Sequence, residues 1–190
     1  TRIPPTDGNN AEVQIGWEIA TDSAFTDLVH SGTASTNAAR DFTLKVDAQD
    51  LLPGTSYYFR FKVAGLTSPV GRCKTLPAGS IDQVRFAVLS CSNYPAGLFH
   101  VYAAAAAEAE LDAVLHLGDY IYEYGNGGYA TEDAAALGRL LPDDNASEIL
   151  SLDDYRKRYA LYRTDADLQL LHASAPFIAV WDDHEVANDT

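Results

Sequence analysis

Residues 113–123 read AVLHLGDYIYE, a short continuous apolar run that ends in a Gly-Asp pair. Two further runs have the same form: residues 84–90 (VRFAVLS) precede Cys91-Ser92-Asn93, and residues 177–181 (FIAVW) precede DDHEVAND. Continuous apolar runs of this length predict strands that are covered on both faces, as in parallel sheets. The carboxyl ends of such strands meet at one edge of the sheet, so we expect the polar residues that follow them to share one crevice.

The segments between these runs predict helices. Residues 97–111 are rich in alanine and predict one helix, and residues 152–173 predict two, with Ser151 and Thr164 as N-caps. The order strand, helix, strand, helices, strand predicts an α/β arrangement with parallel strands. Residues 124–150 are rich in Gly and Asp and too long for a simple connection, which indicates a lid or a substrate loop.

The first part of the chain has a different pattern. Apolar and polar residues alternate over 11–20, 42–46 and 57–63, which predicts half-buried strands of a small β-sandwich. Residues 52–57 (LPGTSY) are similar to a fibronectin type III tyrosine corner, in which the hydroxyl of Tyr57 would bond back to the chain near the turn. We therefore expect a fibronectin III-like β-sandwich domain over 1–77, a short linker, and an α/β domain over 81–190.

The charge is strongly acidic and unevenly distributed. The chain has 13 Lys and Arg against 27 Asp and Glu, a net charge of −14, which argues against binding nucleic acid or an anionic membrane. Residues 1–80 contribute seven basic and eight acidic side chains, and residues 81–190 contribute six and nineteen. Either the second part has a solvated acidic surface, or some of its carboxylates surround cations. No apolar run is long enough to span a membrane.

The residues at the expected strand ends are suited to binding metal ions. Carboxylates held close together repel one another unless a multivalent cation lies between them. Asp119 follows a glycine and could bridge two metals, while the phenol of Tyr122 requires a strong Lewis acid such as a ferric ion to lose its proton. A thiolate from Cys91 would favour a transition metal over magnesium. The adjacent Asp183 and His184 are expected to diverge from an extended strand end, one toward metal and one toward substrate.

Several of these residues also allow a structural interpretation. Cys91 could pair with Cys73 in a disulfide, although its position at a strand end favours a ligand role. His116, inside an apolar run, is expected to be a core residue or to contact a metal ligand without binding the metal itself. Residues 156–158 (RKR) and Arg163 are expected to form a solvated helix face rather than a phosphate site.

The whole set of motifs resembles a known family. The segments that carry the resemblance are Ser90-Cys91-Ser92-Asn93-Tyr94, GDYIYE at 118–123, YRKRYALYRTDADLQLLHASAP at 155–176 and WDDHEVAND at 181–189. Together they resemble the PhoD-type alkaline phosphatase/phosphodiesterase family of the metallophosphoesterase superfamily. The preceding fibronectin-like segment is similar to the small N-terminal domain of those enzymes.

The resemblance implies a layered metallophosphoesterase α/β domain that hydrolyses phosphoesters, with a metal-bound hydroxide or oxo group as nucleophile and with Fe³⁺ and Ca²⁺ as cofactors. Cys91, Asp119 and Tyr122 match the ferric ligands of the family, and Asp183 matches a ligand of the second metal. His184 matches a histidine that contacts the phosphate and can protonate the leaving group. Asn188 is a weaker candidate for calcium coordination.

The resemblance also sets expectations about context. It implies a phosphoester substrate, a secreted or periplasmic location, and further metal ligands on the remainder of the catalytic domain. The chain contains no Met, which predicts a processed protein or a fragment. Two alternatives stay open: a purple-acid-phosphatase-like enzyme, and a non-enzymatic calcium-binding extracellular interaction module.

Overall fold

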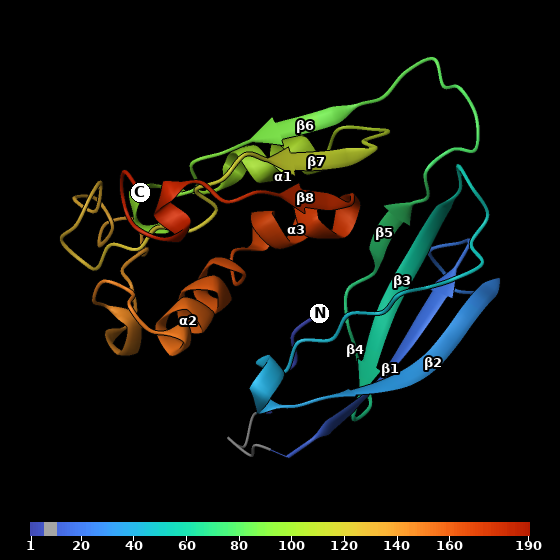
Figure 1. Ribbon diagram of the computed structural model, residues 1–190, viewed down its shortest axis with the longest axis horizontal. Helices are drawn as coiled ribbons and strands as arrows, with labels where there is room; N and C mark the ends of the chain where they lie inside the picture. The colour runs from blue at the N-terminus through green and yellow to red at the C-terminus, as the bar shows by residue number, and fades with distance from the viewer. Residues whose placement is uncertain (6–10) are drawn as a thin grey trace. The chain divides into compact units, whose positions relative to one another are not determined.

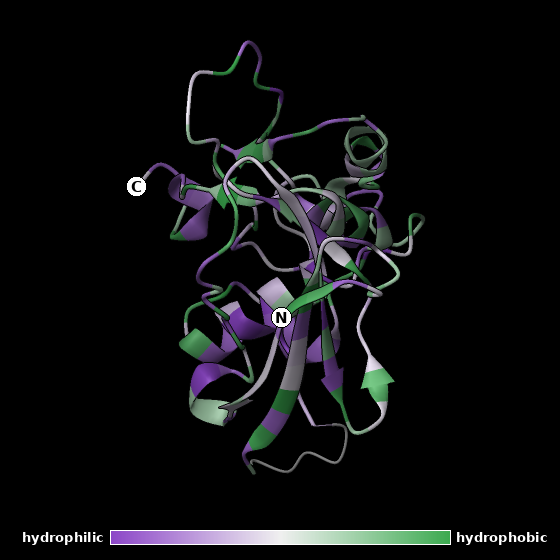
Figure 2. Cartoon of the chain, turned by 90° about the vertical axis from the view of Figure 1, so that its right-hand side faces the viewer, coloured by the Kyte–Doolittle hydropathy of each residue, from purple (hydrophilic) through white to green (hydrophobic). Residues whose placement is uncertain are grey.

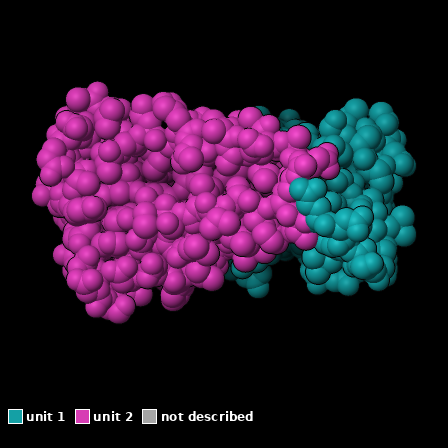
Figure 3. Space-filling model, turned by 90° about the horizontal axis from the view of Figure 1, so that it is seen from above, with its two compact units in different colours: residues 1–83 teal, residues 84–190 magenta. Residues whose placement is uncertain are grey.

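The chain folds into two compact units. The structure is a computed structural model that describes residues 1–5 and 11–190. The units comprise Thr1–Gln83 and Val84–Thr190 (Figure 3). Within the described residues, no helix has the length and apolar character needed to cross a membrane.

The first unit is built on an antiparallel sheet (Figure 1). Its strands are β1 (Val13–Ala20), β2 (Leu28–Thr36), β3 (Ser56–Val63), β4 (Leu66–Thr67) and β5 (Gly71–Lys74). The order is β2-β1-β3-β4, and β5 pairs with β3. The predicted alternation buries Ile15 and Ile19 of β1 while Gln14 stays exposed, and alternating hydropathy is visible along the strands (Figure 2).

The predicted strand over residues 42–46 does not form. Only Thr43 is paired, in an isolated antiparallel bridge with Arg2. Asp41 and Phe42 have φ values of 51° and 52°, which turn the chain away from an extended conformation. Phe42 and Leu44 are nevertheless buried, so the alternating pattern indicated their burial correctly and their backbone conformation wrongly.

The second unit contains the predicted parallel sheet, in the order β6-β7-β8. The expectation that its strands are covered on both faces is wrong for the described residues, because Phe86, Val88 and Ile178 are exposed. Its strands are β6 (Phe86–Leu89), β7 (Ala113–His116) and β8 (Phe177–Ala179). The register pairs Leu89 with His116 and His116 with Ala179. The three strands therefore end level with one another, and the segments that follow them leave the sheet from one edge.

Three helices accompany this sheet: α1 (His100–Ala106), α2 (Leu152–Tyr162) and α3 (Ala166–Ser174). Ser151 caps α2 in a reciprocal capping box with Asp154, as predicted. The prediction of Thr164 as the second cap is wrong, because the side chain of Asp165 accepts the first amides of α3. Helix α1 is shorter than the predicted 97–111, and Glu110 has a left-handed φ of 63°.

The core of the second unit lies between the sheet and the helices. Its buried members are largely aromatic and aliphatic: Tyr94, Phe99, Tyr102, Leu111, Val114, Tyr120, Ile121, Leu141, Ile149, Tyr162, Leu168, Leu171 and Ala175. His116 lies at the end of β7 on the same side and is 1% exposed. Its Nε2 contacts Ser92 Oγ at 3.0 Å and Tyr102 Oη at 3.2 Å, while Nδ1 is buried without a partner. Burial lowers the pKa of His116 to about 4, so its ring is neutral at pH 7.

The basic cluster of α2 is divided between two roles. Lys157 pairs with Asp153 at 3.1 Å, as expected for a solvated helix face. Arg158 contradicts that expectation, because it is 1% exposed and donates to five backbone and side-chain oxygens. These oxygens belong to Tyr122, Tyr124, Asn145 and Ser147. Arg158 thus satisfies carbonyl groups of a segment that has no strand or α-helix to satisfy them.

The tyrosine corner is confirmed and can be tested. Tyr57 is 1% exposed, and its hydroxyl accepts a hydrogen bond from the Leu52 amide at 2.9 Å. We expect Tyr57→Phe to lower the free energy of unfolding of the first unit by about 1 kcal/mol, the usual value of such a bond. Urea unfolding followed by circular dichroism measures this change. An unchanged unfolding midpoint would contradict a stabilising role for the corner.

The low pKa of His116 predicts a loss of stability in acid. Its folded pKa of about 4 lies below the ordinary value of 6.5, so its contribution is complete above pH 6.5 and is lost as the pH falls toward 4. The loss expected from this residue is about 3 kcal/mol. In urea unfolding between pH 7 and pH 4, His116→Phe should lose about that much less stability than the unmodified protein. Equal losses in the two proteins would show that His116 titrates normally.

Candidate metal centre

The edge where the three strands end carries three irregular segments. Residues 91–93 follow β6, residues 118–123 follow β7, and residues 182–189 follow β8. Two backbone hydrogen bonds join the first two segments: Cys91 N donates to Gly118 O at 3.2 Å, and Ser92 N donates to Asp119 O at 2.8 Å. Segments far apart in sequence therefore lie together at one edge of the sheet.

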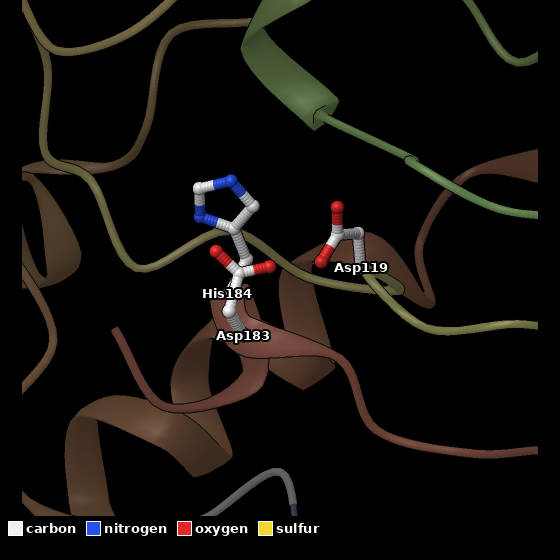
Figure 4. A group of neighbouring side chains, drawn as sticks. All are labelled: Asp119, Asp183 and His184. Carbon is white, nitrogen blue, oxygen red and sulfur yellow. The ribbon is translucent and has the colours of Figure 1, made fainter. Parts of the chain in front are cut away.

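Three of the predicted site residues form a group that could hold a metal ion. Asp119, Asp183 and His184 each offer one ligand atom, and these atoms lie within 4.8 Å of one another. Asp119 comes from the turn after β7, whereas Asp183 and His184 come from the turn after β8 (Figure 4). Asp119 Oδ1 is buried and accepts no hydrogen bond. A buried carboxylate oxygen without a donor is what a cation would be expected to satisfy.

The other two predicted ligands approach the second oxygen of the same carboxylate. Cys91 Sγ lies 3.5 Å from Asp119 Oδ2, and the Tyr122 hydroxyl lies 3.3 Å from it. Burial raises the pKa of Tyr122 well above its usual range, and the nearby Asp119 and Cys91 raise it further. The phenol therefore keeps its proton unless a strong positive charge enters the group.

The backbone at this group is unusual for residues other than glycine. Cys91 has a φ of 61° and Asp119 a φ of 52°, and Gly118 between the strand and Asp119 has a φ of 103°. Left-handed conformations in non-glycine residues carry a cost and are concentrated at functional sites. The turns at the ends of β6 and β7 are thus shaped to direct these two side chains.

The turn after β8 differs from the extended strand end that was expected. Asp183, His184 and Glu185 form a 3₁₀ turn, capped by the side chain of Asp182. The tight turn brings one ligand atom each of Asp183 and His184 within 4.8 Å of one another and of Asp119, closer together than an extended strand end would place them. Asp183 Oδ2 accepts a hydrogen bond from Asp189 N at 2.6 Å, and this bond lowers the pKa of Asp183.

Asn188 lies at the rim of the site. Its side chain is exposed and donates to Asp189 Oδ2 at 2.8 Å. Its backbone amide donates to Glu123 Oε1 at 2.8 Å. Asn188 is therefore linked to the site through its main chain.

Glu123 and Glu185 are two buried carboxylates whose roles the sequence did not reveal. Glu123 Oε2 accepts from His184 Nδ1 at 2.8 Å, which leaves Nε2 as the ring nitrogen free to meet a ligand. The rings of Tyr122 and His184 pack together beside this contact, with centroids 4.2 Å apart and planes tilted by 31°. Glu185 accepts backbone amides on both sides of the site. The sequence signal for Glu123 is its place directly after the GDYIY motif, but its partner lies 61 residues away.

The two cysteines lie in different units and in different surroundings. Cys73 and Cys91 are both free thiols in the structure. Burial raises the pKa of the Cys73 thiol, which is typical of an inert structural cysteine. Cys91 thus keeps its sulfur available to the group around Asp119.

Comparisons with known proteins agree across the whole chain. The sequence profile of the PhoD-like phosphatase family matches residues 86–189, and that of the PhoD-like phosphatase N-terminal domain matches residues 1–77. Alkaline phosphatase D of Bacillus subtilis (strain 168) is 40% identical over 196 residues, covering 100% of this chain and 33% of that protein.

A solved structure described as "Structure of PhoD" superposes with a TM-score of 0.87 at 41% sequence identity. The match covers 95% of this chain and 34% of the solved one, so the chain spans about a third of the length of both relatives. The two profile matches cover most of both structural units, and the match over 86–189 spans the positions of the predicted ligands. The chain belongs to the PhoD-like phosphatase family.

Proposed function

We propose that the second unit carries part of the active site of a metal-dependent phosphoester hydrolase. The observation that carries this proposal is the convergence on Asp119. Cys91 and Tyr122 lie against its Oδ2, and Oδ1 is buried without a donor. One ligand atom each of Asp183 and His184 lies within 4.8 Å of a carboxylate oxygen of Asp119. A carboxylate with candidate ligands from three strand ends around it is suited to bridge two metal ions.

The chemistry of the donors supports two different metals. The carboxylate and phenolate oxygens suit a hard, highly charged cation, whereas the Cys91 thiolate favours a transition metal over Mg²⁺ or Ca²⁺. Fe³⁺ meets both requirements, and its charge would favour loss of the Tyr122 proton despite the raised pKa of that phenol. On the other side, Asp183 offers carboxylate oxygen, the ligand type that Ca²⁺ prefers. Cys91, Asp119 and Tyr122 would hold Fe³⁺, and Asp119 and Asp183 would hold Ca²⁺. The amide oxygen of Asn188 is a further candidate ligand for Ca²⁺.

The protein's own groups would then bind and orient the phosphoester. When bound, the metals supply an activated water and positive charge opposite the phosphoryl oxygens. His184 presents Nε2 to the phosphoryl group or the leaving oxygen, because its Nδ1 is committed to Glu123. Packing against the Tyr122 ring limits rotation of the imidazole. Glu123 therefore holds both the orientation and the tautomer of His184.

The acidic charge of this part of the chain is compatible with an anionic substrate. Residues 81–190 contain nineteen acidic and six basic side chains, which alone would repel a phosphate ester. Bound multivalent cations reverse the sign of the field locally at the strand ends. Since the relatives are about three times longer, we propose that later segments of the complete protein add further ligands and enclose the substrate.

The bridging role predicts the effect of Asp119→Asn in the complete protein. The amide would remove one negative charge from both metal positions, so metal content and hydrolysis of bis-p-nitrophenyl phosphate should fall together. We expect kcat/KM to fall about a thousandfold, equivalent to ~4 kcal/mol of transition-state stabilisation. Metal analysis and steady-state kinetics on the same samples measure both quantities. Retained turnover in the variant would refute the bridging role.

The ferric assignment predicts a spectroscopic signature. A tyrosinate bound to Fe³⁺ absorbs visible light, so the iron-loaded protein should be coloured and Tyr122→Phe should abolish the band. Tyr120→Phe is the matched control, because the Tyr120 hydroxyl contacts His172 rather than Asp119. The absorption band should persist in this variant. A protein that binds calcium but no iron after careful loading would exclude Fe³⁺ and favour the non-enzymatic alternative.

A further inference from the structure

The carboxylate of Glu185 is surrounded by backbone amides. Its Oε2 accepts from Asp119 N at 2.9 Å and from Asp182 N at 2.7 Å. Its Oε1 accepts from Tyr120 N at 2.5 Å and from Ile121 N at 3.3 Å. The side chain is 6% exposed, so these bonds replace the water that a free carboxylate would bind.

These four bonds use the whole accepting capacity of the group. An ionised carboxylate has about four lone-pair sites, and each one faces a donor here. Glu185 lies beside Asp183 and His184 in the same turn, yet it has no oxygen left to offer a metal. Asp119 differs, because its Oδ1 has no donor at all. Glu185 therefore holds the backbone, whereas the carboxylate of Asp119 keeps one oxygen available for a metal ion.

The bonds join two turns that carry different ligands. Asp119, Tyr120 and Ile121 belong to the turn after β7, and Asp182 begins the turn after β8. The two turns are also packed without spare room at Gly118, where an added Cβ would lie 2.4 Å from the Cβ of Asp182. Glu185 belongs to the 3₁₀ turn after β8 and binds amides of the turn after β7. The length and charge of its side chain therefore set the distance between the two turns.

The other group of ligands is held by different contacts. Cys91 and Asp119 are tied together by backbone bonds between residues 91–92 and 118–119. Tyr122 is held at its amide by the Tyr162 hydroxyl at 3.3 Å and at its carbonyl by Arg158 at 2.5 Å. Glu185 also accepts the amides of residues 119–121, but none of the bonds just described involves it. Cys91, Asp119 and Tyr122 therefore keep supports of their own when the junction with Asp183 loosens.

We propose that Glu185 is a positioning residue that sets the spacing between Asp119 and Asp183, and hence the affinity of the second metal position. The inference rests on the proposed function, because it assigns Asp119 to both metals and Asp183 to the second. A change at Glu185 therefore lowers the affinity of the second metal position, while the arrangement of Cys91 and Tyr122 is retained. A residue needed only for folding would affect both positions alike.

The test uses Glu185→Gln in the complete protein. Glutamine keeps the shape, but its NH₂ group would face backbone donors in place of an oxygen, so at least two of the four bonds are lost. Samples loaded with Fe³⁺ are titrated with Ca²⁺ by calorimetry, and the tyrosinate band is recorded on the same samples. We expect Ca²⁺ binding to weaken about 10–100-fold, as is typical when a partner of a ligand is removed, with the band unchanged.

Two matched variants define the comparison. Glu132→Gln changes an exposed glutamate of the same unit and should leave Ca²⁺ affinity, band and turnover unchanged. Glu123→Gln changes a buried glutamate that contacts His184, so it should lower turnover while the tyrosinate band is retained. Should Glu185→Gln fail to fold, Glu185→Asp keeps the charge but is one methylene shorter, and it should show the same selective loss.

The outcomes separate this inference from the proposed function. An unmodified protein without iron binding or hydrolysis would overturn the proposed function itself. An active unmodified protein whose Glu185→Gln variant binds Ca²⁺ normally would overturn the positioning role alone. Parallel loss of Ca²⁺ affinity and of the tyrosinate band would also overturn it, because that pattern indicates a general structural role.

Discussion

The mutual repulsion of acidic groups around Asp119 is the constraint on which the second unit depends. Cys91, Tyr122, Asp183 and Asp119 itself are all groups that become negative or bind cations, and they converge from three strand ends. Without positive charge, the phenol stays protonated, as the raised pKa of Tyr122 indicates. A site of this kind costs stability when empty and regains it through bound cations, which couples metal binding to folding.

The segments that carry these groups have little regular secondary structure, so their backbone amides and carbonyls need side-chain partners. Buried charged side chains provide both acceptors for the amides and donors for the carbonyls. The carboxylate of Glu185 accepts amides from residues 119–121, and the guanidinium of Arg158 donates to the carbonyls of Tyr122 and Tyr124. The polar groups of this irregular backbone are thereby satisfied by fixed side chains, which suits residues that must keep ligands at set distances.

The sequence predicted the parts of this protein that depend on local pattern. Continuous apolar runs identified the parallel strands, and their common edge brought Asp119 together with Asp183 and His184. The pattern failed where the backbone departs from the regular structure that alternation or alanine content suggests. Phe42 has a left-handed φ within an apparent strand, and α1 ends at Ala106 although alanine and glutamate continue beyond it. The roles of Glu123, Arg158 and Glu185 were missed because their partners lie tens of residues away.

The burial of Asn145 has a practical consequence for producing the protein. Asn145-Ala146-Ser147 is an acceptor triplet for N-linked glycans, yet Asn145 is 5% exposed and its amide bonds both to Arg158 Nε and to Asp154 O. A glycan on this nitrogen would break its contact with Asp154 O and would have to fit beside the Arg158 guanidinium, which also supports the Tyr122 carbonyl. Secretion through a eukaryotic host could attach sugar only before folding and would trap those molecules unfolded, so a host without this modification is the appropriate source of material.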